Sequence, residues 1–474
     1  MGTISAAISA ITGALDADQS ALNIVSNNVA NASTTGYTQE VANWQENSPV
    51  TIGGISYGDG VTQTGPTSVR DKVLTERLDQ QQQLESASST RLTALDSVQA
   101  LFSSATSTSS TSSDGDIGSD LTSFFDSFAS LESTPTSSSL RDSVLSAATT
   151  LASDISGAAS SLESQKSALD QEAAGVTSQA NALTASIAQL NKQIMDVSPD
   201  SDAGTLEDQR QEDISELSKL VGVNQITTEN NGLSITTTSG AVLVSEGQSF
   251  EITNGTVDGV THFFVGTTDI TEGLTTGGGE LGGYLTARDS DIPSVLNSLD
   301  QLAYSVSTQV NAMNNTGSDL NGDTGTAASP LYIFNEPTEV SGSALAMTVV
   351  MTDPSEIAAA STGSATGDNS NATAMADLAN QTIVNGETPS NYYSSFVSSL
   401  GTTVSEVTTE NTVQTASVTQ LQSQIDSLSG VNLNDEASSL TTLERSYQAA
   451  SQVFSILDTI MASALNLGEQ TTVS

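Results

Sequence analysis

The sequence predicts a mainly α-helical protein with a β insertion, built from terminal coiled-coil helices, a long helical rod or bundle domain and a small antiparallel β domain. Three observations carry this prediction. Apolar residues recur at helical spacing at both ends of the chain, a seven-residue repeat runs through residues 155–194, and alternation with a period of two replaces it between residues 233 and 265. Periods of 3.6 and 2 are the signatures of helix and strand.

The two terminal segments each predict a helix with one apolar face. At the N-terminus the apolar residues recur every three or four positions: Ile4, Ile8, Ile11, Leu15, Leu22, Val25 and Val29. At the C-terminus two sets with a heptad spacing form a coiled-coil seam: Leu440, Tyr447, Phe454 and Met461, with Leu443, Ala450, Leu457 and Ala464 three residues after them. Because the back of each helix is polar, we expect each to be completed only by the other or by copies of itself.

A polar corner follows the first apolar stripe and predicts the end of the N-terminal helix. Asn27, Asn28 and Asn31 carry amides that can bond to open backbone groups at a helix end. Gly36 permits a positive φ before Tyr37. We expect this corner to fix how the chain leaves the helix and enters an extended segment with short strands.

Changes in periodicity divide the chain into five expected domains. In order, these are an N-terminal coiled-coil helix and extended segment (1–66), the first part of a helical rod (67–222), an antiparallel β domain (223–283), the second part of the rod with a short strand region near 331–352 (284–430), and a C-terminal coiled-coil helix (431–474). We expect both chain ends at one pole of the molecule and the β domain at the other.

The chain is strongly acidic, with 55 Asp and Glu against 11 Lys and Arg and a formal net charge of -44. Binding to nucleic acid or to anionic lipid needs clustered cations, so neither nucleic acid nor a membrane is an expected partner. No stretch approaches the roughly 18 apolar residues of a membrane span, and the first residues lack the basic start of a cleavable secretory signal. The absence of cysteine rules out disulfides and thiol chemistry.

Motifs for catalysis, cofactors and metals are weak. His262 is the single histidine and lies in a strand-like run, so a histidine zinc site or a nucleophile pair lacks its residues. The G-x-G-x-x-G pattern at 277–282 lacks a β-α-β context, which favours a flexible return from the β domain to the rod. The calcium-like loops at 319–325 and 114–118 depart from the ligand pattern, which favours turns over weak Ca²⁺ binding. We therefore expect no enzyme, no cofactor and no metal.

Both termini resemble one known family. The N-terminal residues Ala14-Leu15, Val25-Ser26-Asn27-Asn28-Val29-Ala30-Asn31 and Thr35-Gly36-Tyr37 are similar to the signature of the bacterial flagellar rod, hook and hook-associated proteins. Gly430-Val431-Asn432-Leu433 and Tyr447-Gln448-Ala449-Ala450 resemble the other end of the same family. Internal segments resemble its hook-associated members, which join hook to filament: residues 187–194, Asp208-Gln209-Arg210, Gly282-Gly283-Tyr284-Leu285, Arg288-Asp289 and Asp353-Pro354.

The resemblance implies a structural subunit of the hook-filament junction that is exported unfolded by the flagellar type III export machinery and becomes part of the extracellular flagellum. The implied partners are copies of itself, the hook protein, a second junction protein or filament subunits, and a dedicated export chaperone on the C-terminal region. The expected assembly interface comprises Ile4, Ile8, Leu15, Leu22, Val25, Asn27, Asn28, Val29, Asn31, Gly36, Tyr37, Leu440, Tyr447, Phe454, Leu457 and Met461.

Three alternatives remain open at the level of sequence. A flagellar hook or distal rod protein would match both terminal motifs, but it should be mostly β between its terminal helices. An acidic surface adhesin would hold a ligand on the β domain, around residues 225–273. A wall-cutting hydrolase would need a convergent catalytic set, which the sequence does not offer.

Overall fold

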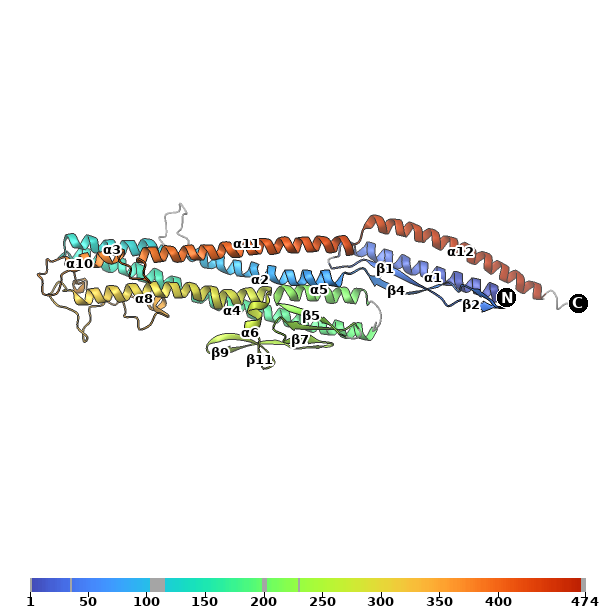
Figure 1. Ribbon diagram of the computed structural model, residues 1–474, viewed down its shortest axis with the longest axis horizontal. Helices are drawn as coiled ribbons and strands as arrows, with labels where there is room; N and C mark the ends of the chain where they lie inside the picture. Colours follow the sequence, from blue (N-terminus) through green and yellow to red (C-terminus); the bar gives the residue numbers. More distant parts are fainter. Residues whose placement is uncertain (1, 35, 103–115, 198–202, 229–230, 470–474) are drawn as a thin grey trace. The chain divides into compact units, whose positions relative to one another are not determined.

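The computed structural model describes residues 2–34, 36–102, 116–197, 203–228 and 231–469. Most of the described residues are helical (Figure 1), which confirms the predicted class. The chain divides by packing into two compact units, the first comprising Met1–Glu85, Thr177–Gly279 and Gln414–Ser474 and the second Ser86–Val176 and Glu280–Val413. No helix in the described part of the chain is long and apolar enough to cross a membrane.

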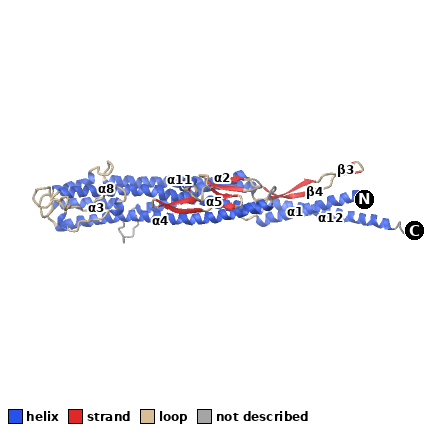
Figure 2. Ribbon diagram, turned by 90° about the horizontal axis from the view of Figure 1, so that it is seen from below, coloured by secondary structure: helices blue, strands red, loops and turns tan. Residues whose placement is uncertain are grey.

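The first unit contains both terminal helices. Helix α1 (Gly2–Asn31) lies along α12 (Leu433–Glu469), and the start of α1 and the end of α12 lie at the same end of the pair (Figures 1 and 2). Four short strands follow α1 and form two antiparallel pairs, β1 (Glu40–Glu46) with β4 (Val61–Ser68) and β2 (Val50–Ile52) with β3 (Ile55–Tyr57). Helix α1 packs against β1 and β4 as well as against α12.

The β segment of the first unit forms two small antiparallel sheets with strand orders β5-β6-β7-β8 and β11-β10-β9. Type of residue and burial alternate along β6, as the period of two predicts. Its strands are β5 (Val223–Thr227), β6 (Leu233–Thr237), β7 (Val242–Ser245), β8 (Gln248–Ser249), β9 (Ile252–Val257), β10 (Val260–Val265) and β11 (Thr268–Asp269), with α5 (Thr205–Leu220) before them and α6 (Thr271–Gly277) after them.

The β segment packs in the same unit as the terminal helices, so its expected placement at a separate pole is wrong. The N-terminal part of α2 (Lys72–Phe102) bonds to the first strand of the β segment, because the Gln83 side-chain amide donates to the Val223 carbonyl at 2.9 Å. The Gln225 amide donates to the Asp79 carboxylate at 2.7 Å. The boundaries of the five domains inferred from periodicity stay a prediction.

The second unit has an apolar core built from helices. Phe124 lies at its centre, with ring centroids 5.4 Å from Phe128 and 5.6 Å from Phe334. Alanines on α4, such as Ala148 and Ala159, are fully buried and let neighbouring helices approach closely. The helices with residues in this unit are α2, α3 (Ile117–Ser133), α4 (Ser138–Val197), α7 (Gly279–Thr286), α8 (Ile292–Thr316), α9 (Ser343–Ala346), α10 (Ser370–Asp377) and α11 (Pro389–Ser429), with one π-helical turn, η1 (Ala287–Asp291), between α7 and α8.

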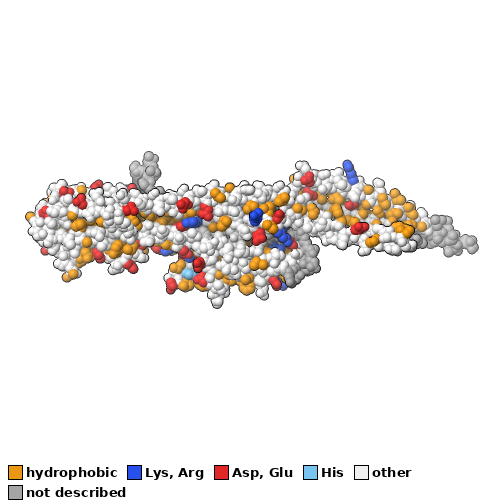
Figure 3. All heavy atoms as spheres, in the orientation of Figure 1, with side chains coloured by type: hydrophobic (Ala, Val, Ile, Leu, Met, Phe, Trp, Pro, Cys, Tyr) orange, Lys and Arg blue, Asp and Glu red, His pale blue; other side chains and the backbone are white. Residues whose placement is uncertain are grey.

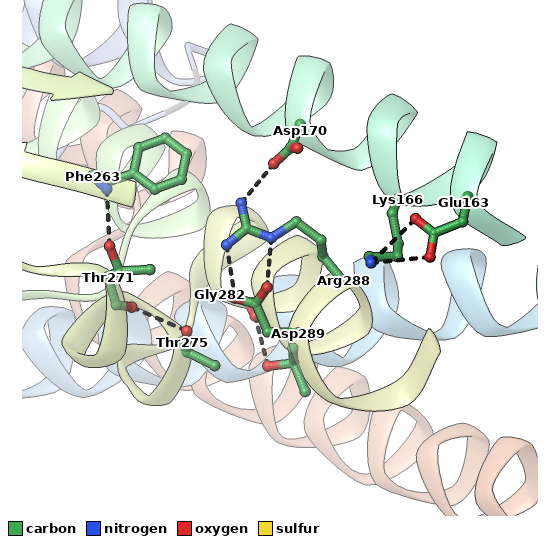
Figure 4. A network of polar contacts seen from close by, with 10 residues as sticks. Glu163, Lys166, Asp170, Phe263, Thr271, Thr275, Gly282, Arg288 and Asp289 are labelled. Carbon is green, nitrogen blue, oxygen red and sulfur yellow. Dashed lines mark hydrogen bonds and ion pairs between the residues drawn. The ribbon is translucent and has the colours of Figure 1, made fainter. Parts of the chain in front are cut away.

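Ion pairs with one buried partner each fix the π-helical turn in the second unit. The Arg288 guanidinium is 3% exposed and bonds to Asp170 of α4 at 2.6 Å and to Asp289 at 2.7 Å (Figure 4). Arg91 of α2 makes a two-pronged contact with Asp291, with N-O distances of 2.8 and 2.9 Å. Both ion pairs involve residues of η1, which connects α7 to α8. They therefore hold α4 and α2 against this connection.

The prediction of a short strand region near residues 331–352 is wrong. Helix α9 lies within it, and among the described residues of this stretch the only β pairing is an isolated bridge between Phe334 and Val349. The Asn311 side chain of α8 donates to the Phe334 carbonyl at 2.8 Å and accepts from the Phe334 amide at 3.0 Å. A helix side chain thus satisfies backbone groups that a partner strand would otherwise bond.

Candidate assembly interface

The predicted apolar residues of the terminal helices are buried to different degrees. On α1, Val25 is 8% exposed and Val29 is 44% exposed, while Ile4, Ile8, Leu15 and Leu22 are half-buried. On α12, Phe454 is 37% exposed, while Leu440, Tyr447, Leu457 and Met461 are half-buried. Because α1 and α12 pack against each other, the structure brings these two sets together, but the pair covers only part of its apolar surface.

A second row of apolar side chains on α12 is left uncovered. Val453, Ile456 and Ile460 are spaced three and four residues apart and are 42%, 59% and 47% exposed. We call these three residues the outer stripe. Figure 3 shows apolar side chains gathered over this end of the helix pair. Contiguous apolar surface of this kind marks interaction sites on soluble proteins.

The side chain of Asn28 joins the helix pair to the polar corner. It is 1% exposed. Its amide nitrogen donates to the Glu40 carbonyl at 2.8 Å and to the Glu436 carboxylate at 3.1 Å, and its oxygen accepts from the Glu40 amide at 3.0 Å and the Tyr37 hydroxyl at 2.8 Å. Two donors and two acceptor positions are all that such an amide has. We call Asn28, Tyr37, Glu40 and Glu436 the joint.

Glu436 of the joint is stabilised as an anion by its position at the start of a helix. Glu436 is 3% exposed and lies in the first turn of α12, where the helix dipole favours an anion. It also accepts a hydrogen bond from the Gln39 side chain at 2.7 Å. Burial, followed by the carboxylates of Glu40 and Glu436, raises the pKa of Tyr37 to about 12, so its hydroxyl keeps the proton that it donates.

The remaining corner residues shape the exit from α1. Asn31 is the last residue of the helix, and its side-chain amide donates to the Asn27 carbonyl at 3.1 Å and to the Asn27 side-chain oxygen at 2.9 Å. Gly36 has a φ of +76°, and a Cβ there would lie 2.5 Å from Oε2 of Glu212. The Glu212 side chain is flexible and can move aside, so it is the positive φ that favours glycine at this turn.

Further contacts anchor the corner within the first unit, and sequence reasoning missed them. The backbone N–H of Gln39 donates to the Ser429 carbonyl at 2.9 Å, and the Ser429 hydroxyl donates to the Val69 carbonyl at 3.0 Å. Arg70 forms an ion pair with Asp208, whose carboxylate also accepts from the backbone of residue 38 at 3.4 Å. The local sequence signal for Glu436 itself is its position as an acidic residue in a first helical turn, and the Glu436-Ala437 pair is also part of the C-terminal family resemblance.

An apolar groove of about 350 Å³ lies beside the joint. Side chains of α1, β1 and α12 line it, among them Ile24, Val41, Trp44 and Leu443. Trp44 is the single tryptophan of the chain and is 50% exposed. The groove thus offers an apolar recess within the same unit as the outer stripe.

The motifs considered for metals and nucleotides have local structural roles. Asp319 accepts from the backbone amides of residues 321 and 323 at 2.8 and 2.7 Å and so closes a turn. Gly279 has a φ of +75°, and a Cβ there would lie 2.6 Å from the Val221 nitrogen. His262 bonds to Asp269 on the neighbouring strand at 2.7 Å. No cluster of three potential metal ligands occurs within the described residues, and residues 114 and 115 lie outside them.

Family models match the chain in three places. Residues 9–38 match the flagella basal body rod protein, and residues 422–467 match the C-terminal part of the flagellar basal body rod FlgEFG proteins. Residues 102–328 match the helical domain of the flagellar hook-associated protein FlgK. The terminal helix pair and its corner therefore define a protein of the flagellar rod, hook and hook-associated class.

Full-length relatives and a solved structure narrow this class. Flagellar hook-associated protein 1 of Salmonella typhimurium is 26% identical over 96% of this chain and 98% of the relative. The proteins of that name from Escherichia coli and Bacillus subtilis are each 25% identical over 96% of this chain, covering 98% and 96% of the relative. The flagellar hook junction protein FlgK of Burkholderia pseudomallei has a similar fold, with a TM-score of 0.65 and 18% identity over 75% of this chain and 100% of that chain.

The chain belongs to the hook-associated protein 1 family, the structural proteins of the hook-filament junction of the bacterial flagellum. The alternative of a hook or distal rod protein predicted mostly β structure between the terminal helices. The described residues between α1 and α12 are mainly helical, which contradicts that alternative.

Proposed function

We propose that this chain assembles at the hook-filament junction by packing its terminal helix pair against copies of itself, and that the assembled copies contact the hook protein and a second junction protein or filament subunits. One observation carries the proposal. The joint fixes α1 and α12 in a defined pair, yet Val453, Ile456 and Ile460 of that pair remain uncovered. We assign the half-buried predicted residues to packing within the pair and the outer stripe to packing between copies.

Burial of the outer stripe against a neighbouring copy would contribute to the free energy of assembly. Burial of one Val or Ile side chain contributes about 1.5 to 3 kcal/mol. Because these three side chains are 42%, 59% and 47% exposed, covering what remains would contribute about half of the full value, or about 2 to 5 kcal/mol per subunit, before the entropic cost of association, which is at least as large. Many weak contacts repeated around an assembly would therefore hold a subunit that is monomeric alone.

Export in an unfolded state by the flagellar type III machinery, to the extracellular flagellum, is the second part of the proposal. The absence of cysteine supports it, because no disulfide has to form before or after passage. An export chaperone on the C-terminal region would shield the apolar residues of α12, which would otherwise associate in solution. The proposed role is structural and includes no enzymatic activity.

The test replaces the outer stripe without touching the joint. In the double variant Ile456→Asp with Ile460→Asp, we expect the purified chain to keep its helical circular dichroism and melting temperature, because both residues are exposed. Cells that carry it should lose the hook-filament junction and stop swimming.

The matched control places two Asp residues on the polar back of the same helix, Gln448→Asp with Ser455→Asp. Both positions are exposed, and the added charge is the same. Control cells should swim. Normal swimming of cells with the outer-stripe variant would disprove the proposed packing.

A further inference from the structure

Helices α2, α4 and α7 line a cavity of about 450 Å³ in the second unit, and every lining residue belongs to that unit. Ala94 of α2 and Ala168 of α4 leave room where longer side chains would fill the space, and Leu169 adds an apolar wall. A cavity of this volume is large enough for a small organic molecule. We call it the three-helix cavity.

Two carboxylates line the three-helix cavity, those of Glu172 on α4 and Glu280 in the first turn of α7. Both act on the same hydroxyl group. Burial, followed by the negative charge of Glu280 and then by that of Glu172, raises the pKa of Tyr284 to about 12. The Tyr284 hydroxyl donates to Oε1 of Glu280 at 3.1 Å. The two negative charges therefore lie near the same part of the lining.

No Lys or Arg is among the described residues that line the three-helix cavity. The two basic residues that directly adjoin lining residues in the sequence are bound elsewhere. Lys166 of α4 bonds to Glu163 at 3.3 Å (Figure 4), and Arg91 of α2 bonds to Asp291 at 2.8 Å. Neither carboxylate of the cavity forms an ion pair within the described part of the chain. The chain itself thus leaves this negative charge without a cation.

Other polar groups of the lining also offer oxygen atoms. The Thr93 hydroxyl donates to the Ser89 carbonyl at 3.0 Å and the Ser97 hydroxyl donates to the Thr93 carbonyl at 3.1 Å, so each keeps only lone pairs for a ligand. Oε1 of Gln165 is buried and has no hydrogen-bond partner within the described residues. Because a buried acceptor without a donor costs free energy, a ligand that donates hydrogen bonds would be favoured.

We propose that the three-helix cavity binds a small organic cation that carries one amine or amidine group on an apolar body. Charge complementarity identifies this class, because an ammonium or amidinium group donates several hydrogen bonds and would meet two carboxylates that lack a cation. The apolar body would cover Ala94, Ala168 and Leu169 and lose contact with water there. The inference goes beyond the proposed function and does not depend on it.

Other small ligands fit the three-helix cavity less well. An anion would be repelled by Glu172 and Glu280. A neutral compound would form only neutral hydrogen bonds to the lining, which are about half as strong as those between charged groups. An inorganic cation would gain nothing from the apolar wall, and no cluster of three potential metal ligands occurs in the described ranges.

The experiment measures binding of three compounds that share one ring: benzylamine, benzyl alcohol and benzoate. The full-length chain is titrated with each at neutral pH and about 150 mM salt, where exposed charges are screened, and binding is followed by saturation-transfer NMR of the ligand. We expect saturable binding of benzylamine with a dissociation constant of about 1 mM. Benzyl alcohol and benzoate should bind at least about tenfold more weakly.

Two variants locate the binding. Glu172→Gln with Glu280→Gln should weaken benzylamine binding about tenfold, because charged hydrogen bonds become neutral. Glu406→Gln with Glu410→Gln is the matched control, since both residues are exposed on α11 in the same unit and the change in net charge is equal. Ala168→Leu fills the cavity without changing the charge and should also weaken binding about tenfold. Helical circular dichroism checks that each variant folds.

Three results would overturn the inference. The first is no saturable binding of benzylamine to the folded wild-type chain. The second is equal affinity for benzylamine and benzyl alcohol, which would show that the carboxylates are not used. The third is an equal loss of affinity in the cavity pair and the control pair, which would show general attraction of a cation to an acidic surface. None of these results bears on the proposed function, which the swimming assay tests separately.

Discussion

The exchange of an amide for a carboxylate at position 28 tests the joint most directly. N28D keeps the size and shape of the side chain, and its oxygens still accept from Tyr37 and the Glu40 amide. It loses both donated hydrogen bonds and places a negative oxygen where an amide nitrogen lay 3.1 Å from Glu436.

The expected loss of stability follows from these contacts. A hydrogen bond to a neutral carbonyl is worth about 1 kcal/mol and one to a carboxylate about 2 kcal/mol. Repulsion between two buried carboxylates adds at least about 1 kcal/mol. N28D should therefore lower the free energy of unfolding of the first unit by about 4 kcal/mol or more.

Trp44 provides the assay. It is the single tryptophan and lines the groove beside the joint, so urea unfolding followed by its fluorescence reports on the first unit. N23D is the matched control, because Asn23 is exposed on the same helix and gains the same charge. The double variant N28D with E436Q restores a donor opposite the new carboxylate and should regain about half of the loss. Equal midpoints for N28D and N23D, or a double variant no more stable than N28D, would refute this account of the joint.

Two further predictions use the same unfolding assay. Burial raises the pKa of Asp79 from 3.8 to about 7. The folded chain therefore binds the proton of the Asp79 carboxyl group more tightly than the unfolded chain does. As a result, the wild type loses stability as pH rises from about 4 to about 7. D79N, which keeps an oxygen for Gln211 and Gln225, should remove this dependence and be more stable at pH 8 by about 2 to 4 kcal/mol; an unchanged pH profile would contradict the burial argument. G36A should cost about 1 to 2 kcal/mol because of its positive φ, whereas G58A, where no atom lies within 4 Å, should change stability by less than about 0.5 kcal/mol, and similar values for the two would contradict the strain at Gly36.

Periodicity was sufficient to predict the helices and the β segment, because burial follows the same geometric repeat as sequence. The seven-residue repeat that includes Ile155 and Leu162 lies on α4, and both side chains are fully buried. The helix itself extends beyond the segment with the repeat, since α4 begins at Ser138. Local pattern failed where a distant side chain replaced local pairing, as Asn311 did for the expected strand at Phe334.

The interface itself was only partly predictable. A heptad pattern places Phe454 on the face that meets α1, yet it is 37% exposed, while Ile456 and Ile460 lie outside the heptad and are more exposed still. The spacing of apolar residues predicts that a helix face is buried, but it does not identify the element or subunit that buries it. The joint was hidden for another reason, because a hydrogen bond between positions that are far apart leaves no periodic trace in the sequence.

Asn28 and Glu436 are 408 positions apart, and both side chains are buried where they meet. In the unfolded export that we propose, the terminus that emerges first would keep these polar groups in water until nearly the whole polypeptide had followed. A prematurely shortened chain never completes this contact. In the export that we propose, only intact molecules would therefore form the helix pair that we propose to pack against a neighbouring copy.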